Sequence, residues 1–385
     1  MLTSDYLDIL SEPIIDLFEE YQKSVIKDIA RRLAKMNFVT PTAAWQLQRA
    51  IESGATYEDI LKKIEQLTPM SEKYLNQAFK QAGVKAVKFD DLIYKKAGLN
   101  PLPLNLSPAM KNVLAAGLRK TGNLINNLVM TTAETGQELF VNAADSAYMK
   151  IVTGAFDYNT AIRQSVKEAA REGLKVINFA SGRRDQLDVS MRRAVLTGVG
   201  QTAGNLTIER ANEMGTDLVQ VSAHIGARNK GTGPGNHESW QGGIYSRSGT
   251  HKKHKNFYKV TGFGTITGLH GINCRHSFFP FFEGISENEY TKAILESYAD
   301  ETVIYNGEEI SFYEATQKQR AIEREIRKVK REASALAAAG QDNTQEIGEV
   351  KSLQAVMRDF IKQTDLDRQY IREGGRVKRI KRTEV

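Results

Sequence analysis

Glycine is concentrated between residues 226 and 271, where 11 of 46 residues are glycine, about three times the average over the 385-residue chain. Glycine destabilises helix interiors and readily adopts the positive φ angles of tight turns. This window therefore excludes long helices and favours short strands joined by turns. Aromatic and β-branched residues within it supply a small core: Trp240, Tyr245, Phe257, Tyr258, Phe263 and Ile266.

The sequence before this window has helical spacing. Apolar residues recur every three or four positions over 12–36, which predicts a long amphipathic helix. Three further helix starts are predicted at Thr40-Pro41, at Thr56 with Asp59, and at Thr68-Pro69, with Gly83 and Gly98 as helix ends. Residues 157–214 predict two helices separated by Gly173 and a short extended piece at 176–180, and the alternating pattern of 217–224 predicts a strand.

The C-terminal part is helical again. Apolar residues keep helical spacing over 322–336 and 347–360. Gly340 is predicted to stop the first helix, and Asn343 with Glu346 resembles a capping pair that starts the second. Two apolar seams joined by a short polar loop predict an antiparallel helical hairpin.

These patterns predict a mainly α-helical α+β fold, with long N-terminal and C-terminal helices and a small glycine-rich β-containing domain. The predicted segments are an N-terminal helical region (1–99), a proline-rich linker (100–108), a helical region (109–216), the glycine-rich domain (217–285), a C-terminal helical hairpin (286–367) and a basic tail (368–385).

Composition excludes several classes of protein. With 41% hydrophobic and 26% charged residues, the chain is expected to be globular. No apolar stretch approaches the roughly 20 residues of a transmembrane helix, and the acidic, polar N-terminus does not resemble a signal peptide. The single cysteine, Cys274, excludes an internal disulfide and fits a reducing compartment.

Charge is unevenly distributed along the chain. The net charge is +7, but residues 224–282 carry +7, residues 317–332 carry +4 and residues 368–385 carry +5, which leaves −9 elsewhere. Basic side chains beside aromatic ones are typical of non-specific nucleic-acid contact, although no sequence-reading module is visible. The candidate nucleic-acid contacts are Lys252, Lys253, Lys255, Arg376, Lys378, Arg379, Lys381 and Arg382.

All six histidines lie between residues 224 and 276. Imidazole and thiolate ligands suit zinc, so the candidate metal ligands are His224, His237, Cys274 and His276, although their spacing matches no standard motif. Three alternatives stay open. The side chains could satisfy buried backbone groups. Cys274 could act as a nucleophile whose pKa is lowered by Arg275, with Asn273 and His276 beside it. The cluster could also belong to a metal-dependent nuclease or hydrolase.

Five motifs in a fixed order then resemble the phage minor capsid protein 2 family. They are Ser222–Arg228 (SAHIGAR), Trp240–Gly242 (WQG), Tyr245-Ser246, Gly262–Gly264 (GFG) and Gly268–His276 (GLHGINCRH). The run Tyr313–Arg320, followed by Glu323–Arg327, looks like the downstream helix of the same family. The motif framework of this resemblance is His224, Gly226, Arg228, Trp240, Gln241, Gly242, Asn273, Cys274, Arg275 and His276.

The resemblance implies a non-enzymatic head protein of a tailed phage, similar in role to Mu-type head-morphogenesis proteins. Such a protein is made in the host bacterial cytoplasm and lies inside the capsid near the portal vertex, where it contributes to head assembly and to genome packaging or delivery. Its implied partners are the portal protein, the major capsid protein or scaffold, packaged double-stranded DNA and other copies of itself. It implies no catalytic residue and no cofactor. We expect the acidic helices to contact protein, and the glycine-rich domain and basic C-terminus to contact DNA. A nucleic-acid binder without a capsid role is a further alternative.

Overall fold

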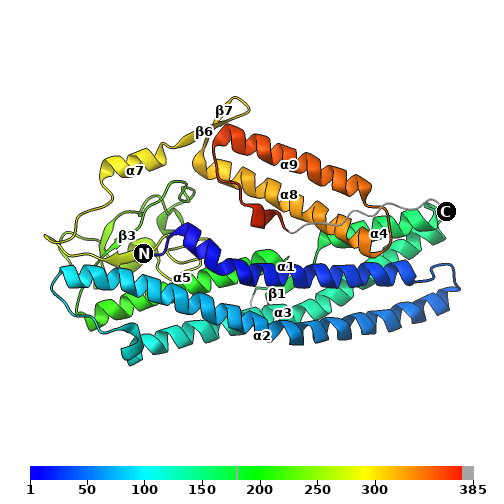
Figure 1. The fold of residues 1–385 in the computed structure, drawn as a ribbon, viewed down its shortest axis with the longest axis horizontal. Coiled ribbons are helices and arrows are strands. Elements are labelled where there is room, and N and C mark those ends of the chain that lie inside the picture. Colours follow the sequence, from blue (N-terminus) through cyan, green and yellow to red (C-terminus); the bar gives the residue numbers. More distant parts are fainter. Residues whose placement is uncertain (179–180, 375–385) are drawn as a thin grey trace. The chain divides into compact units, whose positions relative to one another are not determined.

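The structure is a computed structural model that describes residues 1–178 and 181–374. Long helices dominate it and its sheets are small and antiparallel, which confirms the predicted mainly α-helical α+β fold (Figure 1). The α-helices are α1 (Ser4–Lys35), α2 (Thr42–Lys96), α3 (Pro108–Val152), α4 (Tyr158–Glu172), α5 (Leu187–Glu213), α6 (Phe257–Thr261), α7 (Lys292–Ala299), α8 (Phe312–Ala338) and α9 (Thr344–Thr364). The strands are β1 (Lys175–Asn178), β2 (Arg183–Gln186), β3 (Leu218–Val221), β4 (Ile244–Ser246), β5 (Phe278–Pro280), β6 (Thr302–Tyr305) and β7 (Glu308–Ser311), and 3-10 turns are η1 (Leu104–Leu106), η2 (Gly233–Gly235) and η3 (Tyr370–Glu373).

The chain forms two compact units, each assembled from separate stretches of sequence. The first unit consists of Met1–Ile14, Glu72–Leu124 and Arg192–Thr316. The second consists of Ile15–Ser71, Ile125–Met191 and Gln317–Val385. The 100–108 segment lies within the first unit. There it carries η1, and its Leu102 carbonyl accepts a hydrogen bond from the buried Arg210 (2.6 Å). The domain boundaries expected from the sequence stay predictions.

Helix α2 is a single helix of 55 residues, so the two helix starts predicted at Thr56 and Thr68-Pro69 were wrong. Both threonine hydroxyls donate to the carbonyl four residues earlier, Thr56 to Glu52 (2.7 Å) and Thr68 to Ile64 (2.9 Å). A threonine that bonds back in this way sits inside a helix instead of capping it. Gly83 also lies inside α2, where a Cβ would come within 3.0 Å of Leu206.

Helices α4 and α5 match their predicted positions, with Gly173 as the C-cap of α4. A short hairpin of β1 and β2 lies between them, with Lys175 opposite Gln186 and Asn178 opposite Arg183. Two residues of the predicted extended piece, 179 and 180, lie outside the described residues. The sequence therefore located α4, α5 and β1, but it did not predict β2.

The predicted C-terminal hairpin is formed by α8 and α9, which are joined by a short turn (Figure 1). Gly340 follows α8 with a φ of +70°. The predicted capping pair was wrong, because the Asn343 side chain makes no capping bond and donates instead to the Ala333 carbonyl (2.9 Å). The β6–β7 hairpin before α8 was not predicted, although Asn306-Gly307 at its turn is a strong hairpin signal.

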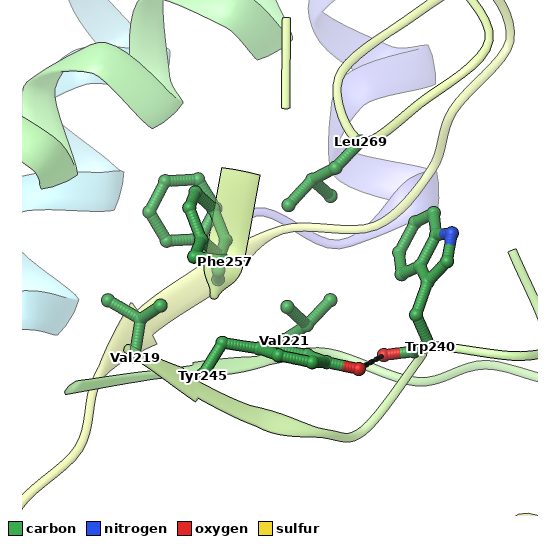
Figure 2. Close-up of a cluster of buried hydrophobic side chains, with 7 residues drawn as sticks. Val219, Val221, Trp240, Tyr245, Phe257 and Leu269 are labelled. Atoms are coloured by element: carbon green, nitrogen blue, oxygen red, sulfur yellow. Dashed lines mark hydrogen bonds between the residues drawn. The ribbon is translucent and has the colours of Figure 1, made fainter. Parts of the chain in front are cut away.

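The glycine-rich window surrounds a three-stranded antiparallel sheet in the order β4–β3–β5. Its central strand β3 is the strand predicted from the alternating pattern, and Val219 lies opposite Tyr245 of β4 and Pro280 of β5. Figure 2 shows the core around this sheet, in which the Tyr245 hydroxyl donates to the Trp240 carbonyl (2.8 Å). The buried core residues are Val219, Val221, Trp240, Tyr245, Phe257, Leu269 and Phe278.

Candidate functional site

The glycine-rich loops bring three candidate metal ligands together. One ring nitrogen of His237, one of His276 and the sulfur of Cys274 all lie within 4.8 Å of one another. His237 follows η2, while Cys274 and His276 lie in the loop that enters β5. Both histidines are buried. The tertiary fold thus joins residues that lie almost 40 positions apart in the sequence.

Oxygen acceptors orient both histidine rings. The His237 Nε2 atom lies 2.8 Å from the Thr267 carbonyl oxygen, so this nitrogen carries the hydrogen. The His276 Nε2 atom lies 3.1 Å from Gln241 Oε1, which also accepts a hydrogen bond from the backbone N–H of His224 (3.1 Å). Since Oε1 is an acceptor, His276 Nε2 must donate. His276 Nδ1 then faces Cys274 Sγ at 3.7 Å.

His224 lies beside this group, with its ring centroid 4.3 Å from that of His276. Its Nδ1 atom is 2.9 Å from the Ile225 carbonyl oxygen and therefore carries the hydrogen. Its Nε2 atom is buried and has no hydrogen-bond partner among the described residues. Trp240 packs against the same cluster, with ring centroids 4.7 Å from His237 and 4.9 Å from His276.

Burial keeps the cluster uncharged. It lowers the pKa of His237 to about 4, and it also lowers the pKa values of His224 and His276. Burial raises the pKa of the Cys274 thiol to about 11 and outweighs the opposing effects of backbone hydrogen bonds, Arg228 and Arg275. Arg275 does lower this pKa, as expected, but desolvation of the thiolate is the larger effect, so the net shift is upward. The thiol is protonated at neutral pH, which disfavours a nucleophilic role.

The other motif residues shape the loops around the cluster. Arg228 donates to the Ile272 carbonyl (2.9 Å), and Arg275 donates to Asp8 of α1 (3.0 Å). Asn273 has a positive φ of +60°, as does Gly226 at +72°. At Gly242, a Cβ would come within 2.8 Å of Leu295 and of Tyr290.

His270 is buried in the same unit, and the sequence did not name it as a candidate site residue. Its φ is +57°, and its ring packs against Gly200 and Gly204 of α5, where an added Cβ would lie about 3 Å from the ring. The sequence signals were its place in the GLHGINCRH motif and the occurrence of these glycines inside a helix. His270 thus couples the glycine-rich loops to α5.

The basic candidates form a different region. Lys252, Lys253 and Lys255 are exposed in the loop before α6. His251 and His254 stack on one another there with ring centroids 4.9 Å apart, and His254 lies 3.3 Å from Glu283. The candidates Arg376, Lys378, Arg379, Lys381 and Arg382 lie outside the described residues.

The chain is similar to two proteins that are named as structural proteins of bacteriophages. The chain is 22% identical over 389 residues to the "Structural protein" of Lactococcus phage LL-H, covering 98% of this chain and 100% of the relative. It is 33% identical over 115 residues to the "Structural protein" of Lactococcus phage mv4, covering 29% of this chain and 85% of the relative. No solved structure matches it.

The chain belongs to the Phage minor capsid protein 2 family, whose pattern matches residues 2–362. This confirms the resemblance drawn from the motifs at 222–276 and extends it over the N-terminal helices. None of the helices in the described ranges is long and apolar enough to cross a membrane.

Proposed function

We propose that this chain is a non-enzymatic minor capsid protein that lies inside the virion near the portal vertex. There it contributes to head assembly and to packaging or delivery of the genome, in contact with the portal protein, the major capsid protein or scaffold, DNA and other copies of itself. The observation that carries this proposal is the family match over residues 2–362. The raised pKa of the partly buried Cys274 thiol supports a non-enzymatic role.

One surface of the second unit suits contact with the portal protein. Near the start of α2, Trp45 stacks on Tyr148 of α3 with ring centroids 4.0 Å apart, and Arg49 pairs with Asp145 (2.7 Å). These contacts hold the two helices together where both expose apolar side chains: Leu47 at 64%, Ile51 at 62%, Met149 at 57% and Val152 at 58% exposure. Leu47 and Ile51 lie four residues apart on one face of α2, and exposed apolar side chains on a shared face are typical of protein-interaction surfaces.

DNA contact is better supported for the loop before α6 than for α8. In α8, Arg327 pairs with Asp188 (3.3 Å), Lys330 donates to the Gly374 carbonyl (2.8 Å), and the partly buried Arg331 donates to the Ala170 carbonyl (3.3 Å). These internal contacts neutralise or cover part of the charge counted over 317–332. The exposed Lys252 and Lys255 are available to phosphates, as is Lys259 beside exposed Tyr258. Lys253 is also exposed, and its ammonium lies 3.7 Å from Glu283.

The location is tested by an electron-microscopy map of purified virions and by detection of the protein in them. We expect density for the long helices next to the portal. Absence from purified virions would overturn the proposal.

The portal contact is tested by co-purification with tagged portal protein. We expect the double variant Leu47→Asp/Ile51→Asp to lose binding to the portal protein. The control Gln46→Asp/Ala50→Asp adds the same charge at exposed positions of the same helix and should keep it.

A further inference from the structure

The three histidines of the cluster share an arrangement that prepares them to bind a metal. Each donates one ring N–H to an oxygen: His237 to Thr267, His276 to Gln241 and His224 to Ile225. Each therefore keeps one ring nitrogen that carries no hydrogen, and the one on His276, Nδ1, lies 3.7 Å from Cys274 Sγ. Metal-ligating histidines commonly donate their other ring N–H to a carbonyl or similar oxygen, which fixes the tautomer and the ring orientation.

Donor atoms of three residues in the cluster also lie close to one another. The sulfur of Cys274 and one nitrogen each of His237 and His276 fall within 4.8 Å. In a tetrahedral site with bonds of about 2.0–2.3 Å, donors are separated by roughly 3.3–3.8 Å. Side-chain adjustments of roughly 1 Å would therefore close the group around a metal ion.

His224 lies beside these three residues and can supply a fourth donor atom. Its Nε2 atom is buried without a hydrogen-bond partner among the described side chains, and its ring lies against that of His276. A buried polar atom without a partner is costly, and coordination to a metal would satisfy it. This observation is independent of the distances among the other three residues.

We propose that His224, His237, Cys274 and His276 form a structural zinc site. A set of three imidazoles and one thiolate suits zinc and disfavours magnesium and calcium, which prefer oxygen ligands. Four protein donors leave no open position for a reacting water, so the site is structural. The metal would join the loops at 224, 237 and 274–276. Ordering this glycine-rich backbone otherwise costs much conformational entropy.

The lone cysteine makes the test direct. Metal analysis of the full chain, purified without chelator, should give about one zinc per molecule. After the zinc is removed, titration with Co²⁺ should produce the absorption of tetrahedral cobalt together with a sulfur-to-cobalt charge-transfer band. Cys274 is the only thiol in the sequence, so this band in the wild-type protein identifies the ligand even if no variant folds. Fluorescence of Trp240, which contacts His237 and His276, should be quenched in the same titration.

Matched variants separate this site from adventitious binding. Cys274→Ser should remove the charge-transfer band, and His224→Gln should weaken cobalt binding at least tenfold. The surface control His251→Ala/His254→Ala removes the exposed histidine pair and should leave the spectrum unchanged. A folded wild-type protein that gives no charge-transfer band would overturn the proposal. So would loss of metal binding in the surface control, and unchanged cobalt affinity in His224→Gln would remove that residue from the ligand set.

Discussion

Single glycines allow α3 and α5 to approach closely. A Cβ at Gly117 would lie 2.0 Å from Thr202 Oγ1, and a Cβ at Gly198 would lie 2.2 Å from Thr121 Oγ1. The two contacts form a reciprocal pair in which each helix offers one glycine and one threonine. Glycine within a helix is unfavourable by itself, so its presence here has a packing reason.

Gly117→Ala should therefore destabilise the protein by about 1–3 kcal/mol, because the threonine Cβ cannot move without shifting α5. Denaturant titration measures the change in the free energy of unfolding. Gly54→Ala is the control, because Gly54 also lies in a helix and a Cβ there meets nothing within 4 Å. This variant should instead stabilise by roughly 0.5–1 kcal/mol. Equal effects of the two substitutions would contradict the packing account.

Asp90 is a buried carboxyl whose protonation is coupled to folding. Burial raises its pKa to about 7, against weaker opposing effects that include a hydrogen bond from Thr207 (2.7 Å) and the charge of Arg210. Because the native pKa lies above the ordinary value of 3.8, the native state binds this proton more tightly than the unfolded state between about pH 4 and pH 7. The contribution of Asp90 to stability is fully present below pH 4 and is lost as the pH rises towards 7.

Asp90→Asn should remove this contribution to the pH dependence, because an amide can still accept the Thr207 bond but does not titrate. The difference in unfolding free energy between variant and wild type should change by about 4 kcal/mol between pH 4 and pH 7.5. The wild type should become less stable relative to the variant as the pH rises. Chemical denaturation at several pH values measures it. A difference that does not vary with pH would show that Asp90 does not titrate in this range.

At the scale of elements, buried ion pairs attach α4 to the C-terminal hairpin. Glu346 of α9 is fully buried and contacts Arg163 (2.6 Å) and Lys167 (2.7 Å), while Arg171 reaches buried Glu332 of α8 (2.7 Å). Burial alone would raise the pKa of Glu346, but the hydrogen bonds from Lys167 and Arg163 lower it. The three cations recur every four residues, so they share one face of α4.

Glu346→Gln should destabilise the protein by about 3 kcal/mol, because the variant leaves the partly buried Arg163 without its counter-charge and Lys167 with only Glu332 at 3.6 Å. Thermal and urea unfolding measure the loss. At the exposed pair Lys292–Glu296, the control Glu296→Gln should cost less than about 0.5 kcal/mol. Comparable losses in both variants would mean that the buried pair contributes no more than a surface pair.

At the scale of the whole molecule, the charge distribution makes a prediction about DNA. The triple variant Lys252→Ala/Lys253→Ala/Lys255→Ala should bind double-stranded DNA more weakly. Its log–log salt slope should be shallower by roughly 0.9 per lost phosphate contact. Removal of residues 375–385 tests the basic tail in the same assay, which measures affinity from about 50 to 200 mM salt.

The matched control is Lys328→Ala, because that lysine lies on α8 beside Glu325 (3.3 Å) and is expected to contribute little to DNA contact. A triple variant with an unchanged slope would exclude the loop before α6 as a DNA contact. An effect of Lys328→Ala as large as that of the loop lysines would favour α8 instead.

The sequence by itself determined the elements whose signals are local. Helical apolar spacing located α1, α8 and α9, alternation located β3, and glycine density located the turns, because each depends on residues a few positions apart. Motif order also identified the family. Local signals failed at Thr56 and Thr68, where a hydroxyl that could cap a helix bonds back within α2 instead.

Only the tertiary structure decided which residues meet and which are buried. It brought His237 beside Cys274 and His276, placed His270 against two glycines of α5, and buried Glu332 and Glu346. It also reversed the expected pKa shift of Cys274, because desolvation depends on the atoms packed around a thiol and not on its neighbours in sequence. Spacing along the chain carries no information about such contacts when the intervening loops are long.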